Sequence, residues 1–145
     1  MIRRAAPSDL DGMRALYRHL NAEDPVPDNA AAEAAWAALL ASPLIRLLIA
    51  ERDGMPVSSC TLVIIPNLTR GARPYALIEN VVTHADYRRQ GLGQAVLAAA
   101  LDTAWEQGCY KVMLATGSKQ ASTLRFYERA GFVTGEKTFF QARRG

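Results

Sequence analysis

The sequence has no apolar run long enough to cross a membrane, because no segment approaches the roughly 18 apolar residues that a spanning helix requires. The first residues, MIRRAAPSDLDG, include arginines but no apolar stretch behind them, so we expect no secretory signal. Cysteine is scarce as well, and both cysteines, Cys60 and Cys109, lie in apolar segments. We therefore expect reduced core thiols and a cytoplasmic protein.

Histidine and clustered positive charge are also limited. His19 and His84 are far apart along the chain, and with two separated cysteines they make no coordination set, so we expect no metal site. The net charge is only +3, and the densest basic stretches are pairs of arginines. A nucleic-acid surface needs a basic face with interleaved aromatic residues, whereas a few arginines are enough for a small polyanion. We expect neither nucleic acid nor a membrane as a partner.

The residues that are present are typical of an ordinary globular protein. Half of the 145 residues are apolar, and no internal repeat, low-complexity linker or change of composition divides the chain. This length suits one domain with a core that needs no disulfides. We predict a single domain over residues 1–145.

Hydrophobic periodicity predicts ten elements in the order β-α-α-β-β-β-α-β-α-β. Ser8 is expected to cap the first helix, and Asp53-Gly54 is a strong hairpin signal. The predicted strands cover residues 2–4, both sides of Asp53-Gly54, 75–83 (YALIENVVT), 110–116 and 132–143, and the helices cover 9–20, 31–40, 92–107 and 121–130. This order predicts an α/β (α+β) fold with a mixed sheet and helices on its faces.

Residues 81–97, VVTHADYRRQGLGQAVL, join a strand to a helix through a loop that contains Gly91 and Gly93. The first turn of a helix offers free backbone N–H groups and the positive end of the helix dipole. The glycines let a phosphate approach the backbone, and Arg88 and Arg89 add charge at the same point. This pattern is consistent with a phosphate site, although a tight turn with solvated arginines explains an isolated R-x-x-G-x-G equally well.

Two other phosphate motifs do not fit this stretch. A Walker loop needs Lys-Ser or Lys-Thr after its last glycine, where this chain has Gln94-Ala95. The dinucleotide fingerprint needs a third glycine at the right offset and an acidic residue on the next strand end, and neither is present.

The stretch resembles the acetyl-coenzyme A signature of the GNAT superfamily of N-acetyltransferases, in which a strand, R/Q-x-x-G-x-G/A and a helix follow one another. Residues 122–132, STLRFYERAGF, are similar to the second signature of that family, a helix with F-Y-x-x-x-G-F. The resemblance implies the GNAT acyl-CoA N-acyltransferase fold, with a mixed, mostly antiparallel twisted sheet of six to seven strands flanked by about four helices. It also implies acetyl transfer from acetyl-CoA to a small-molecule amine by direct attack in a ternary complex.

The segments LIENVVTHADYRRQGLG and GCYKVML look especially like glucosamine-6-phosphate N-acetyltransferases. Those commonly read I-E-D where this chain has Ile78-Glu79-Asn80, a difference next to the expected reaction centre. An amino-sugar phosphate is therefore an alternative acceptor. A non-catalytic acyl-CoA sensor that uses the same phosphate loop is an alternative of a different class.

The resemblance implies where the cofactor binds. The pantetheine arm is expected along the backbone of Val81, Val82 and Thr83, with the Val82 N–H directed at the thioester oxygen. Ser122 stands where the family often has an asparagine that binds pantetheine. The pyrophosphate is expected on the loop and first helical turn formed by Arg88, Arg89, Gln90, Gly91, Leu92, Gly93 and Gln94.

Acetyl transfer to an amine also needs a base for the amine and an acid for the thiolate. The F-Y-x-x-x-G-F match implies that Tyr127 is the acid, and its phenol, with a reference pKa near 10, holds a proton at neutral pH. The match also implies that Tyr127 contacts the cofactor. Glu79 is the expected base, directly or through a water, and His84 is the other possibility. We expect His19, at the end of the first helix, to be a C-terminal cation.

Two loops are expected to choose the acceptor. Residues 21–33 carry carboxylates that suit a cationic amine, and residues 66–75 carry Arg70 and Arg73, which suit a phosphate or carboxylate. The last predicted strand, which includes KTFFQAR, resembles the segment through which the family often dimerises, so we expect a homodimer.

Overall fold

Five strands form one sheet in the order β1-β2-β3-β4-β5 in the computed structural model, which describes residues 1–145. They are β1 (Ile2–Arg4), β2 (Ile45–Arg52), β3 (Met55–Ile65), β4 (Tyr75–Thr83) and β5 (Val112–Met113). The first four pair antiparallel in succession, and β5 joins β4 in parallel after a helical crossover. The expected mixed, mostly antiparallel sheet is confirmed.

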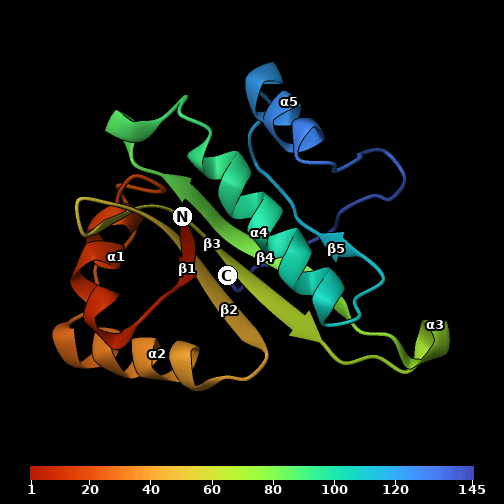
Figure 1. Cartoon of the computed structure of the whole chain (residues 1–145), viewed down its shortest axis with the longest axis horizontal. Coiled ribbons are helices and arrows are strands. Elements are labelled where there is room, and N and C mark those ends of the chain that lie inside the picture. Colours follow the sequence, from red (N-terminus) through yellow and green to blue (C-terminus); the bar gives the residue numbers. More distant parts are fainter. The chain divides into compact units, whose positions relative to one another are not determined.

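The helices divide between two units of the chain (Figure 1). They are α1 (Leu10–Tyr17), α2 (Asn29–Ala41), the short α3 (Thr69–Ala72), α4 (Leu92–Glu106) and α5 (Ala121–Arg129), with 3-10 turns η1 (Pro7–Asp9) and η2 (Ala85–Tyr87). The sheet and helices α1 to α4 belong to a unit formed by Met1–Leu114, and α5 belongs to a second unit, Ala115–Gly145. A single domain over the whole chain stays a prediction.

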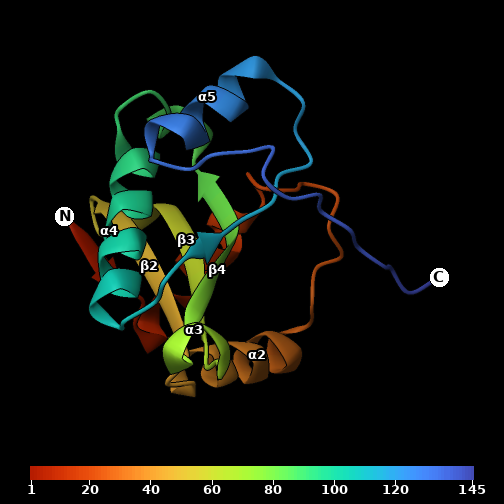
Figure 2. The same cartoon turned by 90° about the vertical axis from the view of Figure 1, so that its right-hand side faces the viewer.

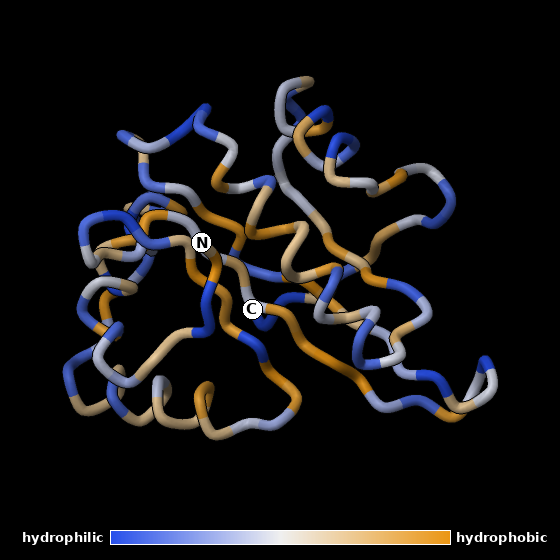
Figure 3. Tube along the Cα trace, in the orientation of Figure 1, coloured by the Kyte–Doolittle hydropathy of each residue, from blue (hydrophilic) through white to orange (hydrophobic).

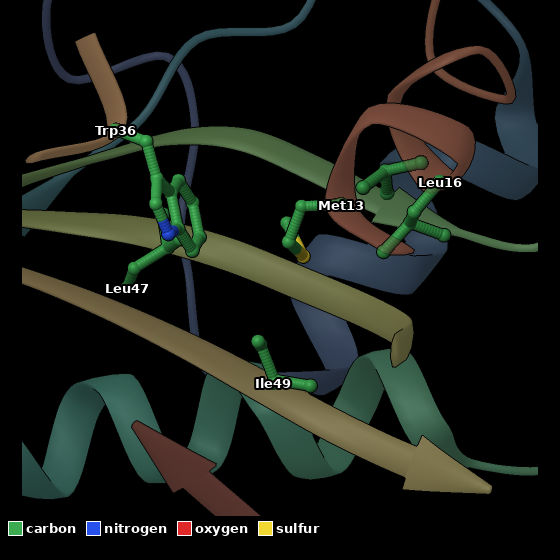
Figure 4. Close-up of a cluster of buried hydrophobic side chains, with 6 residues drawn as sticks. Met13, Leu16, Trp36, Leu47 and Ile49 are labelled. Atoms are coloured by element: carbon green, nitrogen blue, oxygen red, sulfur yellow. The ribbon is translucent and has the colours of Figure 1, made fainter. Parts of the chain in front are cut away.

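The sheet of the first unit lies between α4 on one face and α2 on the other (Figure 2). On the face of α1 and α2, Met13, Leu16 and Trp36 pack against Leu47 and Ile49 of β2 (Figure 4). Alternate residues of β2 point to opposite faces, so its buried neighbours Leu48 and Ala50 face α4, and the central strands are hydrophobic on both sides (Figure 3). This double burial makes the sheet a rigid support for the segment that follows β4.

The hairpin between β2 and β3 forms where the sequence predicts it. Asp53 and Gly54 have φ values of 52° and 76°, the left-handed pair that a two-residue type I′ turn requires. Both cysteines are free and buried, as expected, and burial raises the pKa of Cys60 to about 12.

The first helix begins differently from the prediction. Ser8 lies inside η1 and does not cap α1, whose N-cap residue is Asp9. The Asp9 carboxylate instead accepts hydrogen bonds from the Ala6 N–H at 2.7 Å and from Arg3, which also binds Glu51. Because Asp9 is buried and charged, its ion pair with Arg3 fixes the start of α1 against β1 and β2.

The expectation of six to seven strands was wrong for the C-terminal segment, since the sheet has five. No strand forms over residues 132–143, and Phe139 and Phe140 are exposed. The expected strand at 110–116 is reduced to Val112–Met113, which pairs over two residues only. Such a short ladder offers little template for a further strand.

Candidate active site

A β-bulge interrupts β4 next to the predicted catalytic glutamate. Thr61 of β3 pairs with Glu79 and Ser59 pairs with Val82, so Asn80 and Val81 together lie opposite Cys60 alone. Asn80 has a φ of 53°, a left-handed conformation in which asparagine and aspartate are enriched among residues other than glycine. The conformation therefore accepts the Asn that this chain has in place of the more common Asp.

The two residues of β4 just before the bulge point to opposite faces of the sheet. Ile78 is 1% exposed on the face of α4, whereas Glu79 is exposed on the opposite face. Thr61 lies directly across from Glu79, and the phenol of Tyr17 lies near Thr61. Burial raises the pKa of Tyr17, which keeps its phenol neutral. Two hydroxyls thus lie on the same face as the Glu79 carboxylate.

The sequence reasoning missed Tyr17, Thr61 and the role of Asn80. The adjacent polar pair Glu79-Asn80, followed by two apolar residues, breaks the strict alternation of a strand and was a detectable signal for the bulge. Nothing in the sequence alone pairs Thr61 with Glu79, because that pairing depends on the register of the hairpin.

The outer edge of β4 is open along the bulge. β5 pairs only with Ala76 and Leu77, so on the side away from β3 no strand pairs with β4 from Ile78 to Thr83. The Val82 carbonyl accepts a bond from Ser58 Oγ of β3 at 3.1 Å, and the N–H of His84, two residues on, donates to Val57 O of β3 at 2.8 Å. Backbone groups alternate in direction along a strand, so the Val82 N–H also points toward β3.

This direction changes the expected donor for an acyl oxygen. The expectation assigned Val82, whose side chain is buried in the core beside α1 and whose amide faces β3. The backbone N–H and C=O groups of its neighbours Val81 and Thr83 point the other way, toward the open edge of β4. The Thr83 carbonyl already accepts from Arg88 Nε at 3.2 Å on that side. The geometry favours the amide of Val81 or Thr83 over that of Val82.

The predicted phosphate loop, residues 88–94, leads from this edge into α4. Gly91 is the N-cap residue of α4, with a left-handed φ of 78° and no side chain that caps the helix. The first helical bond runs from Ala95 N to Gly91 O at 3.0 Å, so the N–H groups of Leu92 and Gly93 have no partner within the helix. Apart from Gly91 itself and its neighbours along the chain, no atom of the protein lies within 4 Å of the position that a Gly91 Cβ would take. These features leave room and donors for an anion.

Charge gathers around the same loop. Arg88, Arg89 and Gln90 are exposed, and the bond from Arg88 to the end of β4 holds its guanidinium beside the loop. Arg89 has a φ of 62°, so the backbone turns sharply before Gly91. Figure 3 shows this loop as a hydrophilic segment between the hydrophobic β4 and α4.

The two histidines meet at this loop although they are far apart in the sequence. Their rings lie 4.0 Å apart, and His19 Nδ1 accepts a bond from the Ala85 N–H at 3.3 Å. Desolvation by partial burial lowers the pKa of His19, and the neighbouring His84 and Arg88 lower it further, which opposes the expected role as a cation at the end of the first helix. His84 caps η2 by accepting from the Asp86 N–H, which is the role of a turn residue.

The second unit holds the other predicted site residues. Tyr127 and Phe132 contact each other with ring centroids 6.3 Å apart. The Phe132 N–H donates to Tyr127 O and the Gly131 N–H to Glu128 O, with Gly131 at a φ of 101°, which is a Schellman motif. The spacing F-Y-x-x-x-G-F therefore has a structural basis: it ends α5 and fixes Tyr127 in the last turn.

Side-chain hydroxyl groups form hydrogen bonds at the start of α5. Ser118 Oγ accepts from the Gln120 N–H at 3.2 Å and donates to Thr123 Oγ1 at 3.0 Å, whereas Ser122 is exposed in the first turn. Of the predicted site residues, Ser122 and Tyr127 belong to the second unit and the rest to the first. The first unit brings Glu79, the open edge of β4 and the phosphate loop onto one continuous segment.

The structure contains neither a metal-binding cluster nor a membrane span. No group of three or more histidine, cysteine, aspartate and glutamate side chains is arranged to hold a metal ion. None of the helices combines the length and apolar character needed to cross a membrane.

Known acetyltransferases are similar to this chain in sequence and in fold. The profile of the "Acetyltransferase (GNAT) family" matches residues 13–132. A glucosamine 6-phosphate N-acetyltransferase of Trypanosoma brucei brucei is 34% identical over 130 residues, 90% of this chain and 86% of that protein. A putative acetyltransferase from Agrobacterium tumefaciens has a structure with a TM-score of 0.94, 47% identity and 99% coverage of both chains. The aminoglycoside N-acetyltransferase AAC(6′)-Iy in complex with CoA shares the fold at 20% identity, with a TM-score of 0.81 over 100% of this chain and 95% of that one.

Proposed function

The chain belongs to the GNAT family of acetyltransferases, and on that premise we propose that it transfers the acetyl group of acetyl-CoA to a primary amine of a small molecule. The observation that carries the proposal is the open edge of β4 at the bulge, followed at once by the uncapped start of α4. An acyl-pantetheine arm requires an extended backbone to bind along, and its pyrophosphate requires an anion site at one end. Residues 78–93 supply both features without interruption.

The residues of the loop are proposed to bind the cofactor phosphates. The N–H groups at the start of α4 donate to phosphate oxygens, and Arg88 and Arg89 neutralise their charge. Because the position beside Gly91 is free of protein atoms, the backbone accepts a phosphate at close range. Gln90, Gln94 and, in the second unit, Ser122 are proposed as further cofactor contacts.

In the proposed reaction, the amine nitrogen attacks the thioester carbonyl carbon and the carbon–sulfur bond breaks. Glu79 accepts the proton lost by the nitrogen, directly or through a water, and Tyr127 donates its proton to the departing thiolate. An edge amide of β4 stabilises the negative charge on the carbonyl oxygen. The exposed carboxylate of Glu79, beside the bulge, supports its role, and the fixed position of Tyr127 at the end of α5 supports the role of the phenol.

A glucosamine-6-phosphate acceptor is the finer proposal that the comparisons favour. The Trypanosoma enzyme covers most of this chain at 34% identity. The substitution of Asn80 for the more common Asp keeps the left-handed backbone of the bulge but removes one negative charge beside Glu79. We therefore propose an amino sugar as the first acceptor to assay, with amino-sugar phosphates and aminoglycosides beside it.

The test is the release of free coenzyme A thiol from acetyl-CoA in a screen of amino sugars, amino acids, polyamines and aminoglycosides. Amine-dependent thiol release, with the N-acetylated product seen by mass spectrometry, is the expected result. Tight cofactor binding without turnover of any amine would instead favour a sensor that binds acyl-CoA.

A homodimer is proposed from the C-terminal segment. Phe139 and Phe140 are 66% and 86% exposed, which is unusual for adjacent phenylalanines in a monomer. Burial against a second copy would remove both rings from water. Sedimentation velocity of the wild type and of a Phe139→Ser, Phe140→Ser variant tests this, and a wild-type monomer at assay concentrations would contradict it.

A further inference from the structure

Three cationic side chains surround two tyrosine rings at the beginning of β4. Arg70 and Arg73 lie 5.7 and 5.4 Å from the centroid of the Tyr110 ring, and Lys111 lies 5.4 Å from the same ring and 5.5 Å from that of Tyr75. The two tyrosines contact each other edge to face at 6.4 Å. We call these five residues the basic-aromatic cluster, and all of them belong to the first unit.

The cations of the cluster are not neutralised by the protein. Both ion pairs of the structure are formed by Arg3, far along the chain, and no carboxylate lies within ion-pair distance of Arg70, Arg73 or Lys111. The only hydrogen bond from these three side chains runs from Arg73 Nε to Arg70 O at 2.9 Å. The terminal guanidinium nitrogens of both arginines therefore keep their donors for another partner.

The loop that carries the arginines is held in an unusual conformation. Arg70, Gly71 and Ala72 have consecutive left-handed φ values of 56°, 71° and 61°. Left-handed residues other than glycine are strained and persist where the surroundings fix them, often at binding sites. Here Asn67 fixes the loop: its Nδ2 donates to Thr69 O, Thr69 Oγ1 and Arg73 O at 3.0 to 3.1 Å. The fixed backbone of this loop therefore keeps the positively charged side chains of Arg70 and Arg73 close to each other.

The cluster is separate from the phosphate loop of the cofactor. It lies at Tyr75, where β4 begins, whereas the phosphate loop follows Thr83, where β4 ends. Eight residue steps of a strand at about 3.3 Å each put these ends about 26 Å apart. Figure 2 shows α3 and the loop after β4 at opposite ends of the strand. One coenzyme A pyrophosphate does not reach both.

We propose that Arg70, Arg73 and Lys111 form a second anion site, which binds the phosphate or diphosphate group of a small molecule. Two guanidinium groups with free terminal donors suit the geometry of phosphate oxygens, and a lysine adds a third charge. The tyrosine rings already contact the cations, so they offer no open platform on which nucleic-acid bases stack. A small, highly charged anion is the ligand that this arrangement fits.

The phosphate group could come from two sources, the acceptor itself or a separate small molecule. Tyr75, Leu77 and Glu79 alternate along one face of β4, so the cluster and the proposed base share that face. Four residue steps separate Tyr75 from Glu79 along the backbone, about 13 Å, and the long side chains of the cluster and of Glu79 shorten the gap that an acceptor must span. The idea that the acceptor supplies the phosphate rests on the proposed function, whereas the proposal of an anion site at the basic-aromatic cluster does not.

The experiment measures binding of inorganic pyrophosphate by calorimetry at low salt, with saturating coenzyme A present to occupy the phosphate loop. Arg70→Gln, Arg73→Gln and Lys111→Gln should each weaken pyrophosphate binding about tenfold or more, because each removes a charge-assisted hydrogen bond. The control is Arg52→Gln, an exposed arginine at the β2–β3 hairpin whose loss changes the net charge equally. It should leave the affinity within about twofold.

The absence of saturable pyrophosphate binding by the wild type, or equal weakening by the control and the cluster variants, would overturn the site. Melting temperatures check that each variant is folded. If Arg73→Gln destabilises the loop, Arg70→Gln remains the decisive variant, because of the three cations only Arg73 donates a side-chain hydrogen bond within the loop. Loss of melting temperature with unchanged pyrophosphate affinity would assign the cluster a structural role and also overturn the site.

A second arm identifies the source of the phosphate, once an acceptor amine is known. Pyrophosphate that raises the KM for the amine without lowering kcat would indicate that the site binds the acceptor's own phosphate. Pyrophosphate that binds without affecting KM would indicate a separate ligand. Because the calorimetry requires no catalysis, a failure of the proposed acetyltransferase activity leaves the test of the anion site intact.

Discussion

Replacement of Gly91 by alanine separates cofactor binding from folding. Gly91 has a φ of 78°, and no protein atom lies within 4 Å of the position that the new Cβ would take. Alanine therefore meets no clash inside the protein, and its cost to stability is the left-handed backbone alone, about 1–2 kcal/mol. For a chain of this size, that cost lowers the melting temperature by about 2–8 °C.

The effect on the cofactor is expected to be separate and larger. The Cβ would occupy space that a phosphate needs in order to reach the N–H groups at the start of α4. Loss of one charge-assisted hydrogen bond costs about 1.5–3 kcal/mol, which corresponds to about 10- to 150-fold in the Kd for acetyl-CoA. Isothermal titration of the folded variant with acetyl-CoA measures this directly.

Gly108→Ala is the matched control. Gly108 follows α4 with a φ of 82°, and again no protein atom lies within 4 Å of the place that an alanine Cβ would occupy. The backbone cost should equal that at Gly91, while the affinity for acetyl-CoA should stay unchanged because Gly108 is at the other end of the helix. Equal Kd values for wild type and Gly91→Ala would refute the assignment of the phosphate loop. Unfolding by Gly91→Ala alone would refute the inference that its surroundings are open.

Three further predictions concern catalysis and stability. Tyr127→Phe keeps the ring contact with Phe132 at the end of α5, so the fold and the affinity for acetyl-CoA should persist. Loss of the general acid should lower kcat by about 10²–10⁴-fold. A rate within about twofold of wild type would contradict the role of the phenol. Glu79→Gln should lower kcat/KM most at low pH, where the amine substrate is protonated. The pH profiles of kcat/KM for variant and wild type should converge near the pKa of the amine. A ratio of the two kcat/KM values that is the same at every pH would count against Glu79 as a base. Asp9→Asn should lower stability at pH 7 by about 1.5–3 kcal/mol, because the hydrogen bond from Arg3 holds the pKa of Asp9 below its usual value. That stabilisation is present above the unfolded pKa near 4 and is lost as pH falls through the lowered folded pKa, so the gap in urea stability between wild type and variant should narrow as the pH falls below about 4, and a gap that stays constant there would contradict the pairing.

Local sequence was most informative where a single residue dictates the backbone. Asp53-Gly54 predicted the hairpin because few other pairs adopt two left-handed conformations in succession, and the strand predicted for residues 75–83 has the observed bounds. The helices α4 and α5 end at Glu106 and Arg129, one residue before their predicted ends, and the left-handed Gly108 and Gly131 follow them. Ser8 misled the prediction because Asp9, one residue later, forms a buried ion pair with Arg3 that a local capping rule does not anticipate.

The sequence by itself determined the family, the order of the main elements as far as α5 and the position of the glycine-containing loop between β4 and α4, because each depends on residues that are neighbours along the chain. Only the tertiary structure decided which groups face one another. The register of β3 on β4 creates the bulge at Asn80, places Thr61 opposite Glu79 and directs the Val82 amide into the sheet. Folding also brings His19 against His84, 65 residues later, where burial and the second ring favour a neutral imidazole over the expected cation. Strand register, burial and the proximity of distant residues follow from packing of the whole chain, and no local pattern encodes them.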